Sequence, residues 1–141
     1  MTTTFGAQRA QYSTDAVLSA SPVRLLTLLY DRLLLDLERA EHAGGRDDWS
    51  AFSSALQHGQ AIIAELRSSL RTELWDGADG LLALYNYCTG LLVAANVGRR
   101  PDGVREAIEL LEPLRQAWHE AAGQLSAGVV SSGVNRELGV A

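Results

Sequence analysis

Apolar residues recur at helical spacing along four stretches of the chain, and short polar or glycine-rich segments separate these stretches. The first stretch repeats leucine or alanine every three or four residues: Leu25, Leu26, Leu29, Leu33, Leu37 and Ala40. The second centres on Phe52, Leu56, Ile63 and Leu66, the third on Leu84, Cys88 and Leu92, and the fourth on Val104, Ile108, Leu111 and Trp118. This spacing places the apolar side chains of each stretch on one side of an α-helix.

Residues with strong preferences for helix ends mark the boundaries. Ser21 can cap the first helix and Pro22 suits its first position, and Gly44-Gly45 can end it. Asp47 or Asp48 can cap the second helix, and Pro101 opens the fourth. Pro113 lies inside the fourth helix, where proline removes a backbone hydrogen bond, so a kink or a break is expected there.

These four amphipathic helices with short connections predict an all-α, antiparallel up-down four-helix bundle over residues 21–126. Residues 1–20 are mostly small and polar, which is typical of an arm that docks on a folded domain but does not fold alone. Residues 127–141 lose the helical period and are expected to form a flexible tail.

Composition narrows the class of protein. A chain of 141 residues with 47% hydrophobic content suits a single domain with its own core. The net charge is −5, and the absence of any arginine run argues against binding to nucleic acid or anionic lipid. No apolar run reaches the ~20 residues of a membrane span and no signal peptide is evident, so a cytoplasmic protein without membrane insertion is expected.

Candidate chemistry is sparse, and we expect neither an enzyme nor a bound metal or cofactor. The single cysteine, Cys88, lies among apolar residues and fits a buried thiol that fills space. The three histidines lack the carboxylates at helical spacing that di-iron sites require, and they form no zinc-binding cluster. His58 could receive a phosphoryl group in a phosphotransfer bundle, although an exposed, solvated histidine is the simpler interpretation.

The first helix carries more leucine than one buried side can use. Leu28 and Leu35, seven residues apart, fall outside the arc of the inward leucines and lie beside charged residues. They could form a groove for a partner, be covered by the N-terminal arm, be singly exposed, or form the interface of a homodimer.

Several short segments occur in the order and spacing found in flagellar secretion chaperones of the FliS family. The segments are residues 20–31 (ASPVRLLTLLYD), Tyr12, residues 60–66 (QAIIAEL), Leu84-Tyr85, Ala95-Asn96 and residues 114–118 (LRQAW). Together they extend over most of residues 10–120, and the chain therefore resembles that family.

The resemblance implies a cytoplasmic export chaperone that binds the disordered C-terminal segment of flagellin in an apolar groove. Such a chaperone prevents premature polymerisation and keeps flagellin ready for the flagellar type III export apparatus, with the N-terminal arm covering part of the groove beforehand. A monomer or weak dimer is expected. The flagellin-binding residues that the resemblance and the surplus leucines suggest are Tyr12, Leu25, Leu28, Tyr30, Asp31, Leu35, Tyr85 and Asn96. Tyr30 could instead lie at the edge of the core, Asp31 could be a solvated carboxylate, and Asn96 could help to end a helix.

Overall fold

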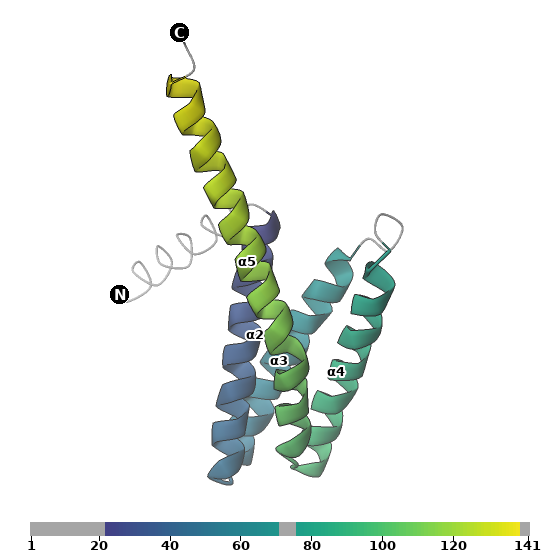
Figure 1. The fold of residues 1–141 in the computed structure, drawn as a ribbon. Coiled ribbons are helices and arrows are strands. Elements are labelled where there is room, and N and C mark those ends of the chain that lie inside the picture. The colour runs from purple at the N-terminus through teal and green to yellow at the C-terminus, as the bar shows by residue number, and fades with distance from the viewer. Residues whose placement is uncertain (1–21, 71–75, 139–141) are drawn as a thin grey trace, which may run out of the picture. The chain divides into compact units, whose positions relative to one another are not determined.

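The computed structural model describes residues 22–70 and 76–138, and every regular element in these ranges is an α-helix. The helices are α2 (Pro22–Gly45), α3 (Trp49–Ser69), α4 (Ala78–Gly98) and α5 (Asp102–Leu138) (Figure 1). The predicted all-α fold is confirmed. The expected cap Ser21 and the N-terminal arm with Tyr12 lie outside the described residues.

The turns between helices follow from the local chemistry of their residues. Asp48, one of the two candidate caps, accepts a hydrogen bond from the backbone N–H of Ala51 at 3.1 Å and so starts α3. Arg99 ends α4 in the left-handed conformation, with φ of 51°, and its N–H donates to the carbonyl of Ala95. The prediction that the first helix ends at Gly44-Gly45 is confirmed.

The chain divides into two compact units. Residues 28–117 contain α3, α4, most of α2 and the first part of α5. Within this unit the α2–α3 and α4–α5 turns lie at one end of the helices, so successive helices run in opposite directions (Figure 1). This arrangement confirms the predicted up-down bundle. The described part of the other unit comprises residues 22–27 of α2 and residues 118–138 of α5.

The core of the 28–117 unit takes side chains from all four helices. Its largest fully buried members are Tyr30, Leu33, Leu37, Phe52, Leu56, Ile63, Leu66, Tyr85, Leu92, Val104 and Leu111. Gly59 lets the helices approach closely, because a Cβ there would lie 3.3 Å from Leu37 Cδ2 and 3.7 Å from Leu92 Cδ1. Cys88 is fully buried, as its apolar neighbours in the sequence predict.

The last helix differs from the prediction in two respects. It passes through Pro113 as one continuous helix, so of the kink or break expected there, the break does not occur. It also continues to Leu138, so residues 127–138, which were predicted to form a flexible tail, are helical. Extending an existing helix adds one hydrogen bond per ordered residue, whereas starting one is costly. Weak local preference is therefore compatible with continuation of a long helix.

Candidate functional site

The two surplus leucines of α2 lie on the surface. Leu28 is 44% exposed and Leu35 is 39% exposed, whereas Leu33 and Leu37 on the inner side are fully buried. The prediction that Leu28 and Leu35 fall outside the buried arc is confirmed. Large apolar side chains on one helix of a bundle therefore face solvent at a spacing of two turns.

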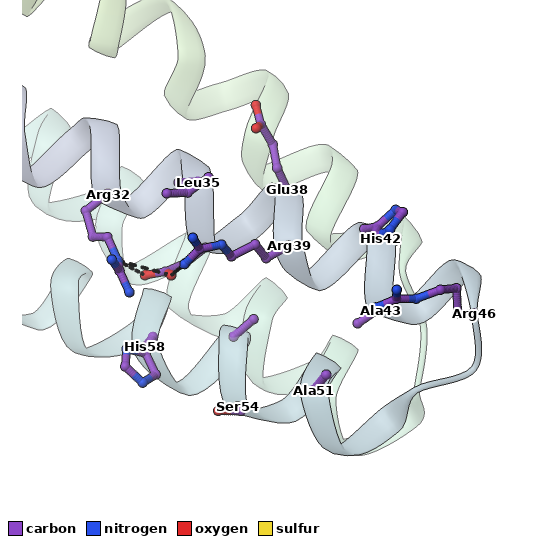
Figure 2. Close-up of a pocket in the computed structure, with 12 residues that line it drawn as sticks. Arg32, Leu35, Glu38, Arg39, His42, Ala43, Arg46, Ala51, Ser54 and His58 are labelled. Carbon is purple, nitrogen blue, oxygen red and sulfur yellow. Dashed lines mark hydrogen bonds and ion pairs between the residues drawn. The ribbon is translucent and has the colours of Figure 1, made fainter.

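Leu35 borders a groove between α2 and α3, with a volume of about 510 Å³ (Figure 2). The groove is lined by Arg32, Leu35, Asp36, Glu38, Arg39, His42, Ala43 and Arg46 from α2 and the following turn, and by Ala51, Ser54, Ala55 and His58 from α3. A second hollow of about 430 Å³ shares Arg32, Asp36 and His58 with it and continues toward Leu29 and Ile62. Together the two hollows follow α2 over most of its length.

Asp36 gives the groove a buried acidic centre that the sequence did not suggest. Its side chain is 3% exposed, and its carboxylate accepts from Arg32 Nε at 3.4 Å and lies 3.9 Å from Arg39 Nη1. Arg32 precedes Asp36 by four residues and Arg39 follows it by three, so both guanidinium groups reach this carboxylate along α2. A buried carboxylate without a cation would be costly, so the two arginines are held at the groove by the charge they neutralise.

Tyr30 and Tyr85 differ from the expectation that they contact a partner. Both are fully buried, and their hydroxyl oxygens lie 2.5 Å apart in a hydrogen bond between α2 and α4. Burial, followed by the bond to Tyr30, raises the pKa of Tyr85 far above its usual value. The structure places these two residues in the core, which is the alternative already open for Tyr30, and they offer no surface to a partner.

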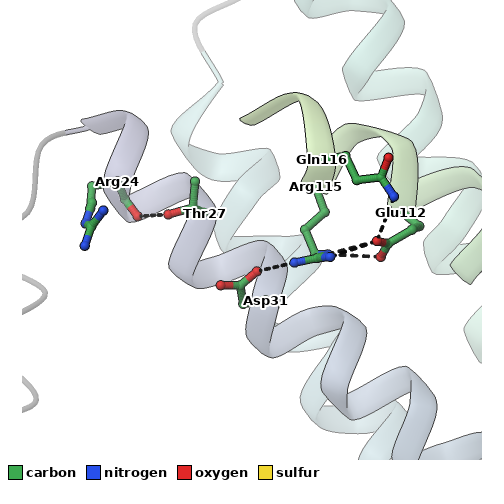
Figure 3. A network of polar contacts seen from close by, with 6 residues as sticks. All are labelled: Arg24, Thr27, Asp31, Glu112, Arg115 and Gln116. Atoms are coloured by element: carbon green, nitrogen blue, oxygen red, sulfur yellow. Dashed lines mark hydrogen bonds and ion pairs between the residues drawn. The ribbon is translucent and has the colours of Figure 1, made fainter. Parts of the chain in front are cut away.

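Asp31 connects α2 to α5. Arg115 Nη1 donates to Asp31 Oδ1 at 3.0 Å, and the same guanidinium donates to Glu112 at distances of 2.9–3.2 Å (Figure 3). The bond from Arg115 is the main reason that the pKa of Glu112 is lowered. The sequence suggested a flagellin-binding residue or a solvated carboxylate at Asp31, and it gave no sign of Arg115, because that residue is distant along the chain.

Of the three remaining predicted residues, the structure describes Leu25 and Asn96. Leu25 is half-buried and belongs to the unit that contains residues 22–27. Asn96 is half-buried near the end of α4, but the helix runs past it to Gly98, so Asn96 does not form the cap. Tyr12 lies outside the described residues. Leu28 and Leu35 are the predicted residues that combine an apolar side chain with an exposed surface.

A second exposed apolar surface lies on α4, and the sequence reasoning missed it. Tyr87, Val93 and Val97 are exposed, the last at 82%, and Asp79 is the sole charged residue of this helix. The sequence of α4 has one charged residue in 21, and this near absence of charge could have indicated an exposed apolar surface. Among the described helices, α4 alone is long and apolar enough to cross a membrane, but the core helices of soluble bundles pass the same test.

The described residues contain no group of three or more histidine, cysteine or acidic side chains placed to hold a metal ion. His58 is exposed on α3 at the point where the two hollows meet. No described carboxylate is hydrogen-bonded to it, so no contact in this part of the chain favours a phosphoryl-accepting role.

Comparison with known proteins identifies the family. The family model described as flagellar protein FliS matches residues 5–125. The chain is 33% identical over 109 residues to the flagellar secretion chaperone FliS of Escherichia coli (strain K12), covering 76% of this chain and 80% of the relative. The chain belongs to the FliS family.

Other FliS proteins and a solved structure agree with this assignment. The flagellar secretion chaperone FliS of Bacillus subtilis (strain 168) is 29% identical over 110 residues, covering 78% of this chain and 82% of the relative. A crystal structure of a flagellar chaperone from bacteria superposes with a TM-score of 0.68 and 17% identity, covering 84% of this chain and 97% of the other. At that identity the structural likeness concerns the fold, and it supports the FliS-type helical bundle.

Proposed function

We propose that this FliS-family chain is a cytoplasmic flagellar export chaperone that binds the disordered C-terminal segment of flagellin. By holding that segment it prevents premature polymerisation and keeps flagellin ready for the export apparatus. Family membership supports the chaperone role, and the exposed Leu28 and Leu35 of α2 support the place of capture, since Leu35 lines the α2–α3 groove and Leu28 lies seven residues before it on the same helix. The exposure of these two leucines is the observation that carries the proposal.

The energetics suit a client that is disordered when free. Burying apolar surface contributes about 25 cal/mol per Å², and a disordered segment gives back part of this gain when it becomes ordered. A long groove that accepts several side chains can provide enough contact area to offset the ordering cost. The exposed Tyr87, Val93 and Val97 of α4 are further apolar side chains that a wrapping segment could cover.

We further propose that residues 1–20, with Tyr12, cover part of this surface until flagellin binds. The arm has few large apolar residues, so it would compete weakly and be displaced by a longer client. A client held reversibly in this way can be released at the export apparatus.

The test is a double substitution, Leu28→Asp with Leu35→Asp, followed by calorimetry with a peptide of the flagellin C-terminal segment. Both side chains are exposed, so the variant should keep its helical circular dichroism and cooperative melting. Its affinity for the flagellin peptide should fall at least tenfold, because binding would remove water from the two introduced carboxylates and place them against apolar side chains. Leu125→Asp changes an exposed leucine that does not line the groove, and it serves as the matched control.

An unchanged affinity in the double variant would show that this surface does not hold flagellin. Equal losses in the double variant and in Leu125→Asp would show that the effect is not specific to the groove. Co-purification of the wild-type chain with full-length flagellin, but not with flagellin lacking its C-terminal segment, tests the choice of client separately.

A further inference from the structure

The α2–α3 groove carries arginines at a regular interval. Arg32, Arg39 and Arg46 line it, each seven residues from the next, with Arg46 directly after the end of α2. Seven residues of α-helix correspond to about two turns and a rise of about 10.5 Å. A partner helix lying along the groove would meet a positive charge at each repeat of its own heptad.

The first two of these arginines are held in place while keeping donors available. Asp36, at 3% exposure, contacts Arg32 Nε and Arg39 Nη1, and the two arginine side chains remain 51% and 56% exposed. A guanidinium group has five N–H donors, so each arginine can contact Asp36 and still donate to a second carboxylate. Figure 2 shows both side chains at the groove, with His58 on the α3 side.

The local charge contrasts with that of the whole chain. The chain has a net charge of −5, whereas the groove is lined by three arginines against two carboxylates, Asp36 and Glu38, and it also contains His42 and His58. One of those carboxylates, Asp36, is buried beneath the arginines. A ligand in the groove therefore meets more positive than negative charge at its surface.

The opposite wall is formed by small side chains. Ala51, Ser54 and Ala55 of α3 line the groove, and Ala43 lies on the α2 side. Small residues allow the backbone of another helix to approach, and Leu35 offers an apolar contact at the edge. The groove thus combines small and apolar side chains with a row of arginines along one wall, beneath which Asp36 is buried.

We propose that the α2–α3 groove selects an amphipathic partner helix that carries carboxylates seven residues apart beside its apolar stripe. Arg32, Arg39 and Arg46 pair with these carboxylates and fix the direction and register of the helix. This proposal rests on the proposed function, since it specifies the kind of client segment that the groove accepts. Residues 1–20 of the chain itself contain one acidic residue, Asp15, and cannot supply such a series of carboxylates.

The test uses two synthetic helical peptides with the same leucine and alanine stripe. One carries three glutamates seven residues apart, and the other carries glutamine at those positions. Fluorescence anisotropy at low salt should show at least about tenfold tighter binding of the glutamate peptide, with the difference shrinking in 0.5 M salt. Equal affinities for the two peptides would overturn the proposal.

Variants assign the effect to the groove. Arg39→Gln should weaken binding of the glutamate peptide by roughly three- to tenfold and leave the glutamine peptide unchanged. Arg100→Gln removes the same charge from an exposed residue that does not line the groove, and it should leave both affinities unchanged. If both variants reduce binding equally, net charge rather than the arginine series explains the selectivity, and the proposal fails.

The outcomes also separate this inference from the proposed function. If the chain captures flagellin but binds the two peptides equally, the chaperone role stands and the proposed selection by the arginine series fails. If the chain binds the glutamate peptide selectively but does not capture flagellin, the role of the arginine series is supported and the proposal that flagellin is the client fails. A dimer in sedimentation that Arg39→Gln, but not Arg100→Gln, dissociates would identify a second copy as the occupant and overturn the proposal.

Discussion

The inner and outer sides of α2 both carry leucines at helical spacing, but their surroundings differ. On the inner side Leu33 and Leu37 pack around Gly59 of α3 and Leu92 of α4 and are fully buried. On the outer side Leu28 and Leu35 are exposed, and Leu35 lies at a groove lined by charged residues. One helix can therefore contribute leucines to the core on one side and offer leucines to a partner on the other. The charged residues around the exposed leucines distinguish the outer side from the inner side.

The largest effect on stability is expected on the inner side. Leu37→Ala removes a fully buried side chain that contacts the position of Gly59, and it should lower the free energy of unfolding by about 2–5 kcal/mol. Leu35→Ala, on the outer side, should change it by less than about 1 kcal/mol. Urea denaturation followed by circular dichroism measures both, and similar losses would erase the distinction between the two sides.

A smaller effect should follow from breaking the tyrosine pair. Tyr30→Phe leaves the buried hydroxyl of Tyr85 without the bond it makes to Tyr30, at a cost of about 1–2 kcal/mol. The double variant Tyr30→Phe with Tyr85→Phe should be more stable than the sum of the single losses predicts, because both hydroxyls are then removed. Strictly additive losses in the same urea experiment would show that the two hydroxyls are not coupled.

The connection between α2 and α5 through Arg115 should contribute less. Arg115→Gln removes its bonds to Asp31 and Glu112, which are partly exposed, so the loss at pH 7 should stay below about 1 kcal/mol. The pKa of Glu112 is lowered from its ordinary value of 4.5, so this stabilisation is present above that value and is lost as pH falls through the folded pKa. Wild type and variant should therefore converge as pH falls through the folded pKa of Glu112, and a constant difference would contradict the ion-pair explanation.

The smallest effect near neutral pH concerns Cys88. Burial, with a further contribution from Glu106, raises its pKa from 9.0 to about 11. The folded thiol should then react with iodoacetamide at pH 8 far more slowly than the urea-unfolded thiol, because the thiolate is the reactive form. The thiol lowers stability only above pH 9, where the unfolded chain loses its proton first. Equal alkylation rates in the folded and unfolded chain would show that Cys88 is accessible.

Much of the bundle could be predicted because its helices depend on nearby residues. Gly44-Gly45 ends α2 and Asp48 caps α3 through contacts that reach only a few residues along the chain. The last helix was predicted less well, since the sequence suggested a kink or a break at Pro113 and a tail from residue 127, whereas the helix is unbroken at Pro113 and continues to Leu138. The local sequence has a low preference for helix at both places. Extending a helix that has already formed is nevertheless favourable, because each added residue gains a backbone hydrogen bond.

For the candidate site, helical periodicity alone places Leu28 and Leu35 outside the buried arc, because it fixes the angle between side chains on one helix. The packing of the helices, by contrast, brings Tyr30 and Tyr85 together in the core, pairs Asp31 with Arg115, and buries Asp36 between two arginines. The first two contacts join residues 55 and 84 positions apart, and the burial of Asp36 depends on how α3 packs against α2. Spacing along one helix does not specify which neighbour covers each side, and that choice is made when the helices pack.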